Sequence, residues 1–317
     1  MAKYSVITSN PDKATPVVVW DYELPSDPEI GDEYWVDGFQ SILIWTGNSW
    51  QRLYTPPTAA EPGQELFTSS SSTFTWTVPS GITSCSIVCV GEGGTGAYIT
   101  VAQPTIGIWG GGGGALSYIN NVSVTAGEEI IIDFPERDTG YTGQNVRTSR
   151  SSRVSRSDNT VICFAEAGGP AVAGRASEGI GDNTYSGGTP TRFNRSSAST
   201  TTTRYFAAGG GSASFGNTAG RGASGAYSTS ASPDAGGGGT GLQGTTLPSS
   251  GQSFGEGVYG GNDSNFTSAG SYGGGGGVLE QYYGSGFPQI FYGSKGTGAV
   301  RIIYGDSRSF PADAEDV

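Results

Sequence analysis

The chain has 317 residues, of which 55 are glycine, and its formal net charge is −12 with no histidine. This charge argues against nucleic acid as the main partner, because phosphate binding needs a basic footprint. A Ser-His-Asp triad and a histidine metal site are excluded, since both need an imidazole. No stretch approaches the ~20 apolar residues that span a bilayer or has a signal-peptide core. We therefore expect a soluble protein made in a cytoplasm.

Residues 1–54 are predicted to form a small β-module with a charge of −5, from three basic and eight acidic residues. Apolar runs separated by turn residues indicate three strands with a core of tryptophans. The strands are Gly31–Asp37, Ser41–Trp45 and Trp50–Tyr54, and the tryptophans are Trp35, Trp45 and Trp50. The spacing of GDEYWVD and WTGNSW resembles small β-modules of phage tail and other virion proteins. A small three-stranded β-unit of another kind remains the alternative.

Residues 55–66 begin with TPPTAAEPGQ and are predicted to be an extended, proline-rich linker between two domains. Residues 67–311 are predicted to form a glycine-rich β domain, and residues 312–317 an acidic tail. The domain shows no convincing helix, so the expected fold class is all-β. We expect its residues 115–124 and 128–134 to pair as a hairpin across a turn at 125–127. The predicted strands are Phe74–Val78, Ser84–Val90, Ala115–Val124, Glu128–Phe134, Thr160–Ala165 and Gly298–Tyr304.

Three runs of consecutive glycines separate these strands. Glycine weakens a helix or strand interior by roughly 0.5–1 kcal/mol relative to alanine, so the runs are either flexible linkers or ordered extended segments that pack closely. Their shortness, their apolar flanks and their recurrence favour an ordered, polyglycine-II-like bundle. Valine at Gly112 or Gly275 should then destabilise the domain. The bundle glycines are Gly110, Gly111, Gly112, Gly113, Gly114, Gly236, Gly237, Gly238, Gly239, Gly273, Gly274, Gly275, Gly276 and Gly277.

Three stretches carry a resemblance to a known family: FTWTVPSGITSCSIVCVGEGG, then GGGGGALSYINNVSVTAGEEIII, then GTGAVRIIYGDSRSFP. Together they resemble the glycine-rich domain of phage tail-fibre and related virion proteins, common in phages of marine cyanobacteria. The resemblance covers roughly residues 67–311 and implies a β-rich domain with a polyglycine-helix bundle. One departure is that Asp133–Pro135 and an arginine-bearing insertion replace a VGxGG-like turn.

Four arginines recur at every third residue, which would align them on one side of an extended left-handed segment. Such a ladder could bind phosphate or carboxylate groups of a cell-surface glycan. A solvated loop, or pairing with acids of a neighbouring subunit, is the favoured alternative. The arginines are Arg147, Arg150, Arg153 and Arg156.

Aromatic residues gather between the glycine runs, where they could bind a sugar or a protein or, as we favour for most of them, cover the sides of the bundle. The candidates for host contact are Tyr282, Tyr283, Phe287, Phe291 and Tyr292. A second group consists of Tyr185, Phe193, Tyr205 and Phe206.

Signals for an enzyme, a metal or a cofactor are weak. Glu128 and Glu129 are adjacent on a strand and point to opposite faces, so they make a poor acid/base pair. The acidic stretch at 27–37 fits no calcium-loop spacing, and no glycine run has the form of a nucleotide loop. We expect no catalytic residue, no metal and no cofactor. The three cysteines, Cys85, Cys89 and Cys163, are expected to be small buried apolar residues without a disulfide.

These observations favour a non-enzymatic structural protein of a phage tail fibre or tail tip. Residues 1–54 would attach it to the virion, and its connecting segments would contact a host glycan or outer-membrane protein. Its partners would be other virion proteins, and a homotrimer is compatible with this role. The alternatives are a capsid decoration or head-fibre protein and a fibre-borne polysaccharide depolymerase.

Overall fold

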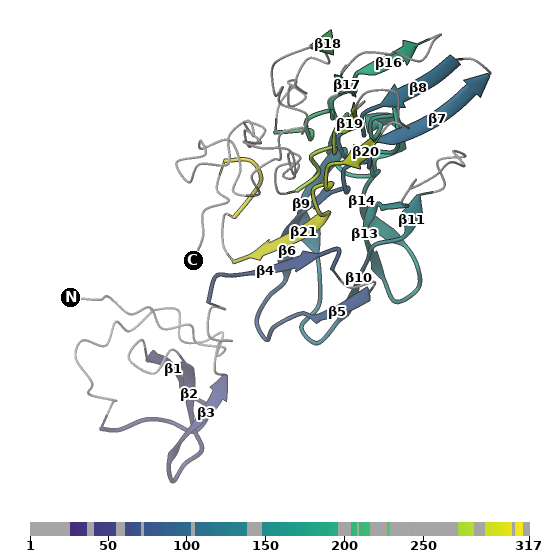
Figure 1. The fold of residues 1–317 in the computed structure, drawn as a ribbon. Helices are drawn as coiled ribbons and strands as arrows, with labels where there is room; N and C mark the ends of the chain where they lie inside the picture. Colours follow the sequence, from purple (N-terminus) through teal and green to yellow (C-terminus); the bar gives the residue numbers. More distant parts are fainter. Residues whose placement is uncertain are drawn as a thin grey trace. The chain divides into compact units, whose positions relative to one another are not determined.

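The computed structural model describes residues 26–36, 41–54, 61–70, 73–102, 105–137, 148–195, 204–207, 209–215, 227–228, 242, 272–281, 289–305 and 308–312. These residues form antiparallel sheets and one 3₁₀ turn, η2 (Ala176–Glu178), and they include no α-helix (Figure 1). The all-β prediction is therefore confirmed. The chain divides into two compact units, Met1–Ala60 and Glu61–Val317.

The first unit contains a three-stranded antiparallel meander. Its strands are β1 (Glu33–Val36), β2 (Ser41–Trp45) and β3 (Trp50–Tyr54), in the order β1-β2-β3. Leu43 is buried, and the rings of Trp45 and Trp50 lie 5.4 Å apart. The strands predicted here are thus present, and two of the three predicted tryptophans pack on each other. The side chain of Trp35 lies outside the described residues.

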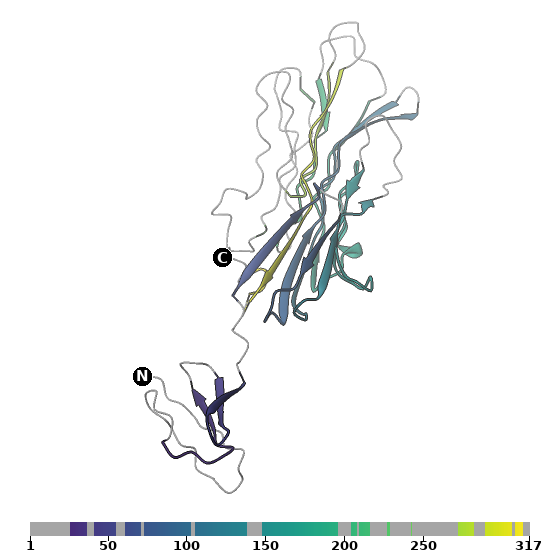
Figure 2. The same ribbon diagram turned by 90° about the horizontal axis from the view of Figure 1, so that it is seen from below.

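The second unit begins with a β-sandwich. Its first sheet has the order β15-β9-β6-β21-β4, and its second sheet has the order β14-β13-β10-β5. Figure 2 shows the strands of this part of the unit running alongside one another. The first sheet consists of β4 (Gly63–Thr68), β6 (Ser84–Val90), β9 (Leu116–Ser123), β15 (Asn183–Tyr185) and β21 (Ala299–Tyr304). The second consists of β5 (Thr73–Thr77), β10 (Glu129–Asp133), β13 (Ser152–Arg156) and β14 (Val161–Ala165).

The two sheets pack face to face through small side chains. The hydroxyl of Ser152 donates to the carbonyl of Val90 at 2.6 Å, and the thiol of Cys163 lies 3.5 Å from the carbonyl of Ser117. Both contacts join a strand of one sheet to a strand of the other. Small residues at these positions therefore let the sheets approach closely.

The predicted hairpin between 115–124 and 128–134 is wrong. β9 pairs with β6 and β15, whereas β10 pairs with β5 and β13. The turn at 125–127 instead crosses from one sheet to the other, and Gly127 donates its N–H to the carbonyl of Val78. Both strands have a buried face, and placing them in facing sheets buries both faces in one core.

The predicted linker also ends earlier than expected. Residues 63–66, assigned to it from the sequence, belong to edge strand β4, which pairs antiparallel with β21. Gln64, Glu65, Leu66 and Phe67 do not alternate between apolar and polar residues, so they do not indicate a strand by themselves. Pairing with β21 supplies the missing stabilisation. Of the predicted acidic tail, residues 313–317 lie outside the described residues.

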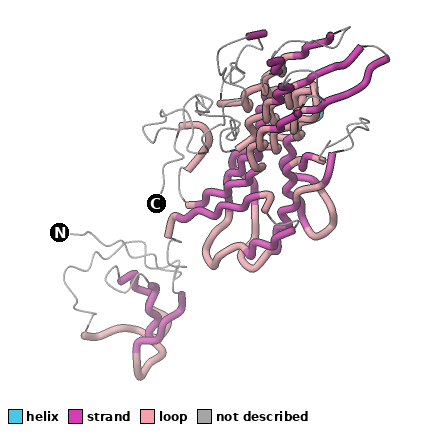
Figure 3. Tube along the Cα trace, in the orientation of Figure 1, coloured by secondary structure: helices cyan, strands magenta, loops and turns pink. Residues whose placement is uncertain are grey.

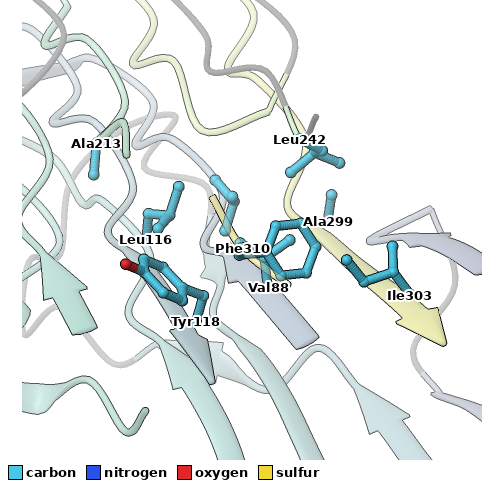
Figure 4. Packing of buried hydrophobic residues seen from close by; sticks show 9 residues of the cluster. Val88, Leu116, Tyr118, Ala213, Leu242, Ala299, Ile303 and Phe310 are labelled. Atoms are coloured by element: carbon cyan, nitrogen blue, oxygen red, sulfur yellow. The ribbon is translucent and has the colours of Figure 1, made fainter. Parts of the chain in front are cut away.

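The other face of the first sandwich sheet is covered by connecting segments (Figure 4). Phe310, from the C-terminal segment, stacks on Phe215 with the ring centroids 5.8 Å apart. Asn120 holds this segment through two hydrogen bonds to the backbone of Phe310, of 2.7 and 2.8 Å. The core cluster comprises Val88, Val90, Leu116, Tyr118, Ala213, Leu242, Ala299, Ile303 and Phe310.

The glycine segments form an ordered bundle beyond the sandwich, drawn as loops in Figure 3. The run at 110–115 lies at its centre, and each of its N–H and C=O groups bonds to another segment rather than within the run. The N–H donors and their acceptors are Gly110 to Thr191, Gly111 to Gly276, Gly112 to Gly169, Gly113 to Gly188, Gly114 to Gly273 and Ala115 to Glu166. The carbonyls of the same six residues accept from Ala171, Gly210, Gly94, Gly174, Ala213 and Gly91, in that order.

These partners repeat with a period of three. Gly111 and Gly114 both donate to the segment at 273–276, and Gly110 and Gly113 both donate to the segment at 188–191. A polyproline-II-type helix has three residues per turn and no internal hydrogen bonds, so its successive groups point to three directions. The run is therefore a polyglycine-II helix inside a ring of neighbours. The predicted bundle is confirmed for the runs at 110–114 and 273–277, and the run at 236–239 lies outside the described residues.

Two smaller sheets lie at the end of this unit away from the sandwich (Figure 1). They have the orders β16-β8-β7 and β18-β17-β19-β20, and we call them the hairpin sheets. They meet through Ile108 and Ala207, which are fully buried. Their strands are β7 (Ala97–Ala102), β8 (Thr105–Trp109), β16 (Arg192–Arg195), β17 (Arg204–Ala207), β18 (Tyr227–Ser228), β19 (Val278–Gln281) and β20 (Gln289–Tyr292).

Candidate functional site

The bundle is a scaffold that admits no side chain at its centre. A Cβ built on Gly112 would lie closer than 3.0 Å to the backbone of Val172 and Ala173, and one built on Gly275 would meet the backbone of Gly111. Each carbonyl that occupies a missing Cβ position belongs to another segment of the chain. Specific chemistry must therefore come from the residues that flank and connect the glycine segments.

Glu92 is a buried carboxylate that joins three parts of the chain. Its Oε1 accepts a hydrogen bond of 2.5 Å from the hydroxyl of Ser69, and its Oε2 accepts one of 2.8 Å from the backbone N–H of Arg150. The ammonium group of Lys295 forms an ion pair with the same Oε2. The Glu92 side chain is only 7% exposed, so these partners compensate for its lost hydration.

Glu166 has the same role for the glycine segment that follows β14. It accepts hydrogen bonds of 2.7 Å from the backbone N–H and 2.8 Å from the guanidinium of Arg175, and Arg137 lies 3.1 Å away. Burial lowers the pKa of Arg137, and the neighbouring carboxylate of Glu166 counteracts this effect. The two glutamates thus hold the ends of glycine segments that have no side chains of their own.

The sequence contains a signal for these two glutamates that the sequence analysis did not use. β6 is followed by Gly-Glu-Gly-Gly at 91–94, and β14 is followed by Glu-Ala-Gly-Gly at 166–169. Each glutamate comes within two residues of the end of a buried strand and directly before the residues that enter the bundle. A lone acidic residue among glycines and alanines, after an apolar strand, indicates a buried and compensated carboxylate.

The arginines at 147–156 do not form a one-sided ladder. Arg153 and Arg156 lie in strand β13, opposite Asp133 and Ile130 of β10, so their side chains point to opposite faces of the sheet. Arg153 pairs with Asp133, which raises the pKa of the guanidinium, and Arg156 pairs with Glu128. Alternation along a strand replaces the three-residue period that the sequence analysis assumed.

The remaining members of the arginine set give little support to a shared site. Arg150 lies in β12 (Ser149–Arg150), which pairs with β11 (Glu136–Arg137), and it donates to the carbonyl of Ser69 at 3.3 Å. Arg147 lies outside the described residues. The described arginines of the set are therefore partners of this chain's own carboxylates and carbonyls.

The aromatic candidates are only partly described. Tyr292 is half-buried and packs with Ile290 against Ile108 and Ala207 between the hairpin sheets. Tyr292 thus packs inside the unit, but against the core of the hairpin sheets and not against the sides of the bundle, where we expected most of these aromatics. Phe291 lies in β20, but its side chain lies outside the described residues, as do Tyr282, Tyr283 and Phe287.

A different pair stands out where the bundle meets the hairpin sheets. The guanidinium carbon of Arg192 lies 5.3 Å from the ring centroid of Trp109, a cation–π arrangement. Nη2 of Arg192 also donates to the carbonyl of Ala171 at 2.7 Å. Trp109 is half-buried and Arg192 is exposed. The sequence analysis missed this pair because Trp109 and Arg192 are far apart in the chain and no motif links them.

Residues 68–305 match the family model of the glycine-rich domain. The chain belongs to this glycine-rich domain family. The match spans most of the chain and includes the glycine runs at 110–114 and 273–277. No curated protein matches the chain.

The cysteines of this glycine-rich domain are buried and free, as predicted. Burial raises the pKa of Cys85 to about 12 and that of Cys89 well above 9.0. Among the described residues, no group of three or more cysteines and carboxylates is placed to hold a metal ion. The described part of the domain also has no helix of the length and hydrophobicity that crossing a membrane requires.

Proposed function

We propose that this chain is a non-enzymatic structural protein of a phage virion, located on the tail fibre or tail tip, and that its connecting segments bind the host surface. The observation that carries the proposal is the glycine bundle, which separates the sandwich from the hairpin sheets. Every group of its central run is paired with another segment. Such a scaffold is rigid, and rigid scaffolds commonly position binding loops.

The direction of the chain through the glycine-rich domain agrees with this proposal. The chain enters the domain at β4, in the sandwich, and the hairpin sheets lie at the other end (Figure 1). A protein attached through residues 1–54 would need its binding residues on the end away from the attachment. The resemblance of the three quoted stretches to phage tail-fibre and virion proteins supports the same role.

The proposal is tested by locating the protein on particles of the phage that encodes it. Immunogold labelling with antibodies against the full chain should decorate the tail fibre or tail tip. The purified full chain should also bind host cells and reduce phage adsorption in competition. Labelling of the capsid alone would instead support a decoration or head-fibre protein, and absence from the particle would contradict the proposal.

An enzymatic role is the second alternative, and a separate assay addresses it. Incubation of the purified chain with host envelope polysaccharide should release no reducing sugar. The adjacent residues Glu128 and Glu129 do not form a catalytic pair of carboxylates. Glu128 forms an ion pair with Arg156, and Glu129 points to the other face of β10. Steady release of reducing sugar would replace the adhesin proposal with a depolymerase.

A further inference from the structure

We propose that Arg192, held against Trp109 where the bundle meets the hairpin sheets, is a binding subsite for the carboxylate or phosphate groups of an anionic surface glycan. The inference rests on the proposed host-binding function and specifies the ligand chemistry of that function. It assigns binding to a residue outside the arginine and aromatic segments that the sequence singled out.

The backbone around Arg192 is fixed by the first glycine of the central run. Gly110 donates its N–H to the carbonyl of Thr191 at 3.0 Å and accepts from the N–H of Ala171 at 2.9 Å. Gly110 also directly follows Trp109. One buried glycine therefore positions the tryptophan, the residue before the arginine and the carbonyl that the arginine contacts. The bundle is the reason that these separate segments meet.

The guanidinium is oriented before any ligand arrives. Its central carbon lies over the ring of Trp109, and its hydrogen bond to Ala171 fixes one of the two terminal nitrogens. Trp109 pairs directly with Arg192 across β8 and β16, while its neighbour Ile108 points to the opposite face and is fully buried between the hairpin sheets. A side chain that is already ordered loses less entropy on binding, which favours affinity.

Arg192 differs in its charge balance from three other arginines that are at least partly exposed. Arg153, Arg156 and Arg175 each pair with a carboxylate of this chain. In the part of the chain that the structure describes, Arg192 has only the aromatic ring and one backbone carbonyl as partners. Its positive charge is therefore not neutralised by an acid there, although the protein as a whole carries −12.

The chemistry of this group selects the class of ligand. A guanidinium presents five N–H donors in a planar fork that matches two oxygens of a carboxylate or a phosphate. Only one nitrogen is engaged by Ala171, so donors remain for such a bidentate contact. A neutral polysaccharide has no charged group that these donors could bind. Because the net charge of the protein is −12, it repels an anionic ligand except where an arginine lies at the contact. Uronate-containing or phosphate-containing glycans are the expected ligands.

The test measures binding of the full chain to three immobilised polysaccharides. They are polygalacturonate as the carboxylate probe, phosphomannan as the phosphate probe and dextran as the neutral control. The wild type should bind at least one anionic polymer, with weaker binding as salt rises, and should not bind dextran. Arg192→Gln should lose about tenfold in affinity or more, the size expected for a charged hydrogen bond.

The matched control is Arg153→Gln, which removes the same charge from a half-exposed arginine that is paired with Asp133. It should keep wild-type binding, and Arg192→Lys, which keeps the charge but not the fork, should restore only part of the lost affinity. Failure of the wild type to bind either anionic polymer, or equal losses in both glutamine variants, would overturn the subsite. Particle labelling and host-cell binding of the wild type report separately on the proposed function.

Discussion

Replacing Gly112 with alanine is the most direct test of the close packing of the bundle. The added Cβ would lie closer than 3.0 Å to three backbone atoms of Val172 and Ala173. The carbonyl of Val172 cannot move freely, because it accepts a hydrogen bond of 2.7 Å from Gly169, whose own carbonyl accepts from Gly112. Relief of the clash must therefore break or stretch these hydrogen bonds.

The expected cost combines two terms. Overpacking costs roughly 1–3 kcal/mol, and a lost backbone hydrogen bond adds about 1 kcal/mol. We expect Gly112→Ala to lower the free energy of unfolding by about 3 kcal/mol, which corresponds to a fall of about 6–12 °C in the melting temperature. The same substitution should leave the strands of the sandwich formed, because the contact is confined to the bundle.

The control for this prediction is Gly127→Ala. Gly127 has a φ of +81° but nothing within 4 Å of the added Cβ, so its cost is the left-handed conformation alone, about 1–2 kcal/mol. Both variants share the reduced entropy of the unfolded chain that alanine brings. Melting followed by circular dichroism gives the comparison. A Gly112→Ala variant as stable as Gly127→Ala would refute the close packing.

Three further predictions follow from the other contacts. Glu166→Gln should lower the free energy of unfolding in urea by about 2 kcal/mol, since it leaves the largely buried side chain of Arg137 without its carboxylate. Glu178→Gln should change this free energy by less than about 0.5 kcal/mol, because Glu178 forms an exposed ion pair with Arg175. Cys85 stays protonated to about pH 12 in the folded chain, while an unfolded thiol loses its proton near pH 9.0. The unfolded state therefore binds fewer protons above pH 9, and stability should fall there by about 1.4 kcal/mol per pH unit for this thiol, a slope that Cys85→Ala should reduce. Deleting residues 1–60 should leave a soluble remainder with an unchanged melting transition, and loss of that transition would show that the two units depend on each other.

Much of the sandwich could be predicted from the sequence because its strands carry a hydrophobic pattern. β6 begins and ends where Ser84–Val90 was predicted, and β21 differs from its prediction by one residue. These strands are rich in valine and isoleucine and are bounded by turn residues. The pairing of β9 and β10 could not be predicted in the same way, because a short turn between two strands is compatible with a hairpin and with a crossing between sheets.

The candidate site could not be predicted from the sequence, because the glycine segments that bring its residues together have no side chains. A glycine run has no side-chain pattern, so the partners of Gly110 and the meeting of Trp109 with Arg192 cannot be derived from spacing. The arginines at 150–156 illustrate the opposite error, because a regular spacing was read as a helix of three residues per turn. Ser152–Arg156 lacks the apolar alternation that would have indicated β13, with Val154 as its one apolar residue.

The order of the strands has a consequence for how the chain folds. β21 lies between β6 and β4, from which it is far apart in sequence, and the central glycine run takes partners from positions as distant as Gly91 and Gly276. Contacts between residues so distant in sequence close long loops and slow folding. The first sheet cannot be completed until residues 299–304 have left the ribosome. Until then, the edges of β4 and β6 that pair with β21 stay unpaired.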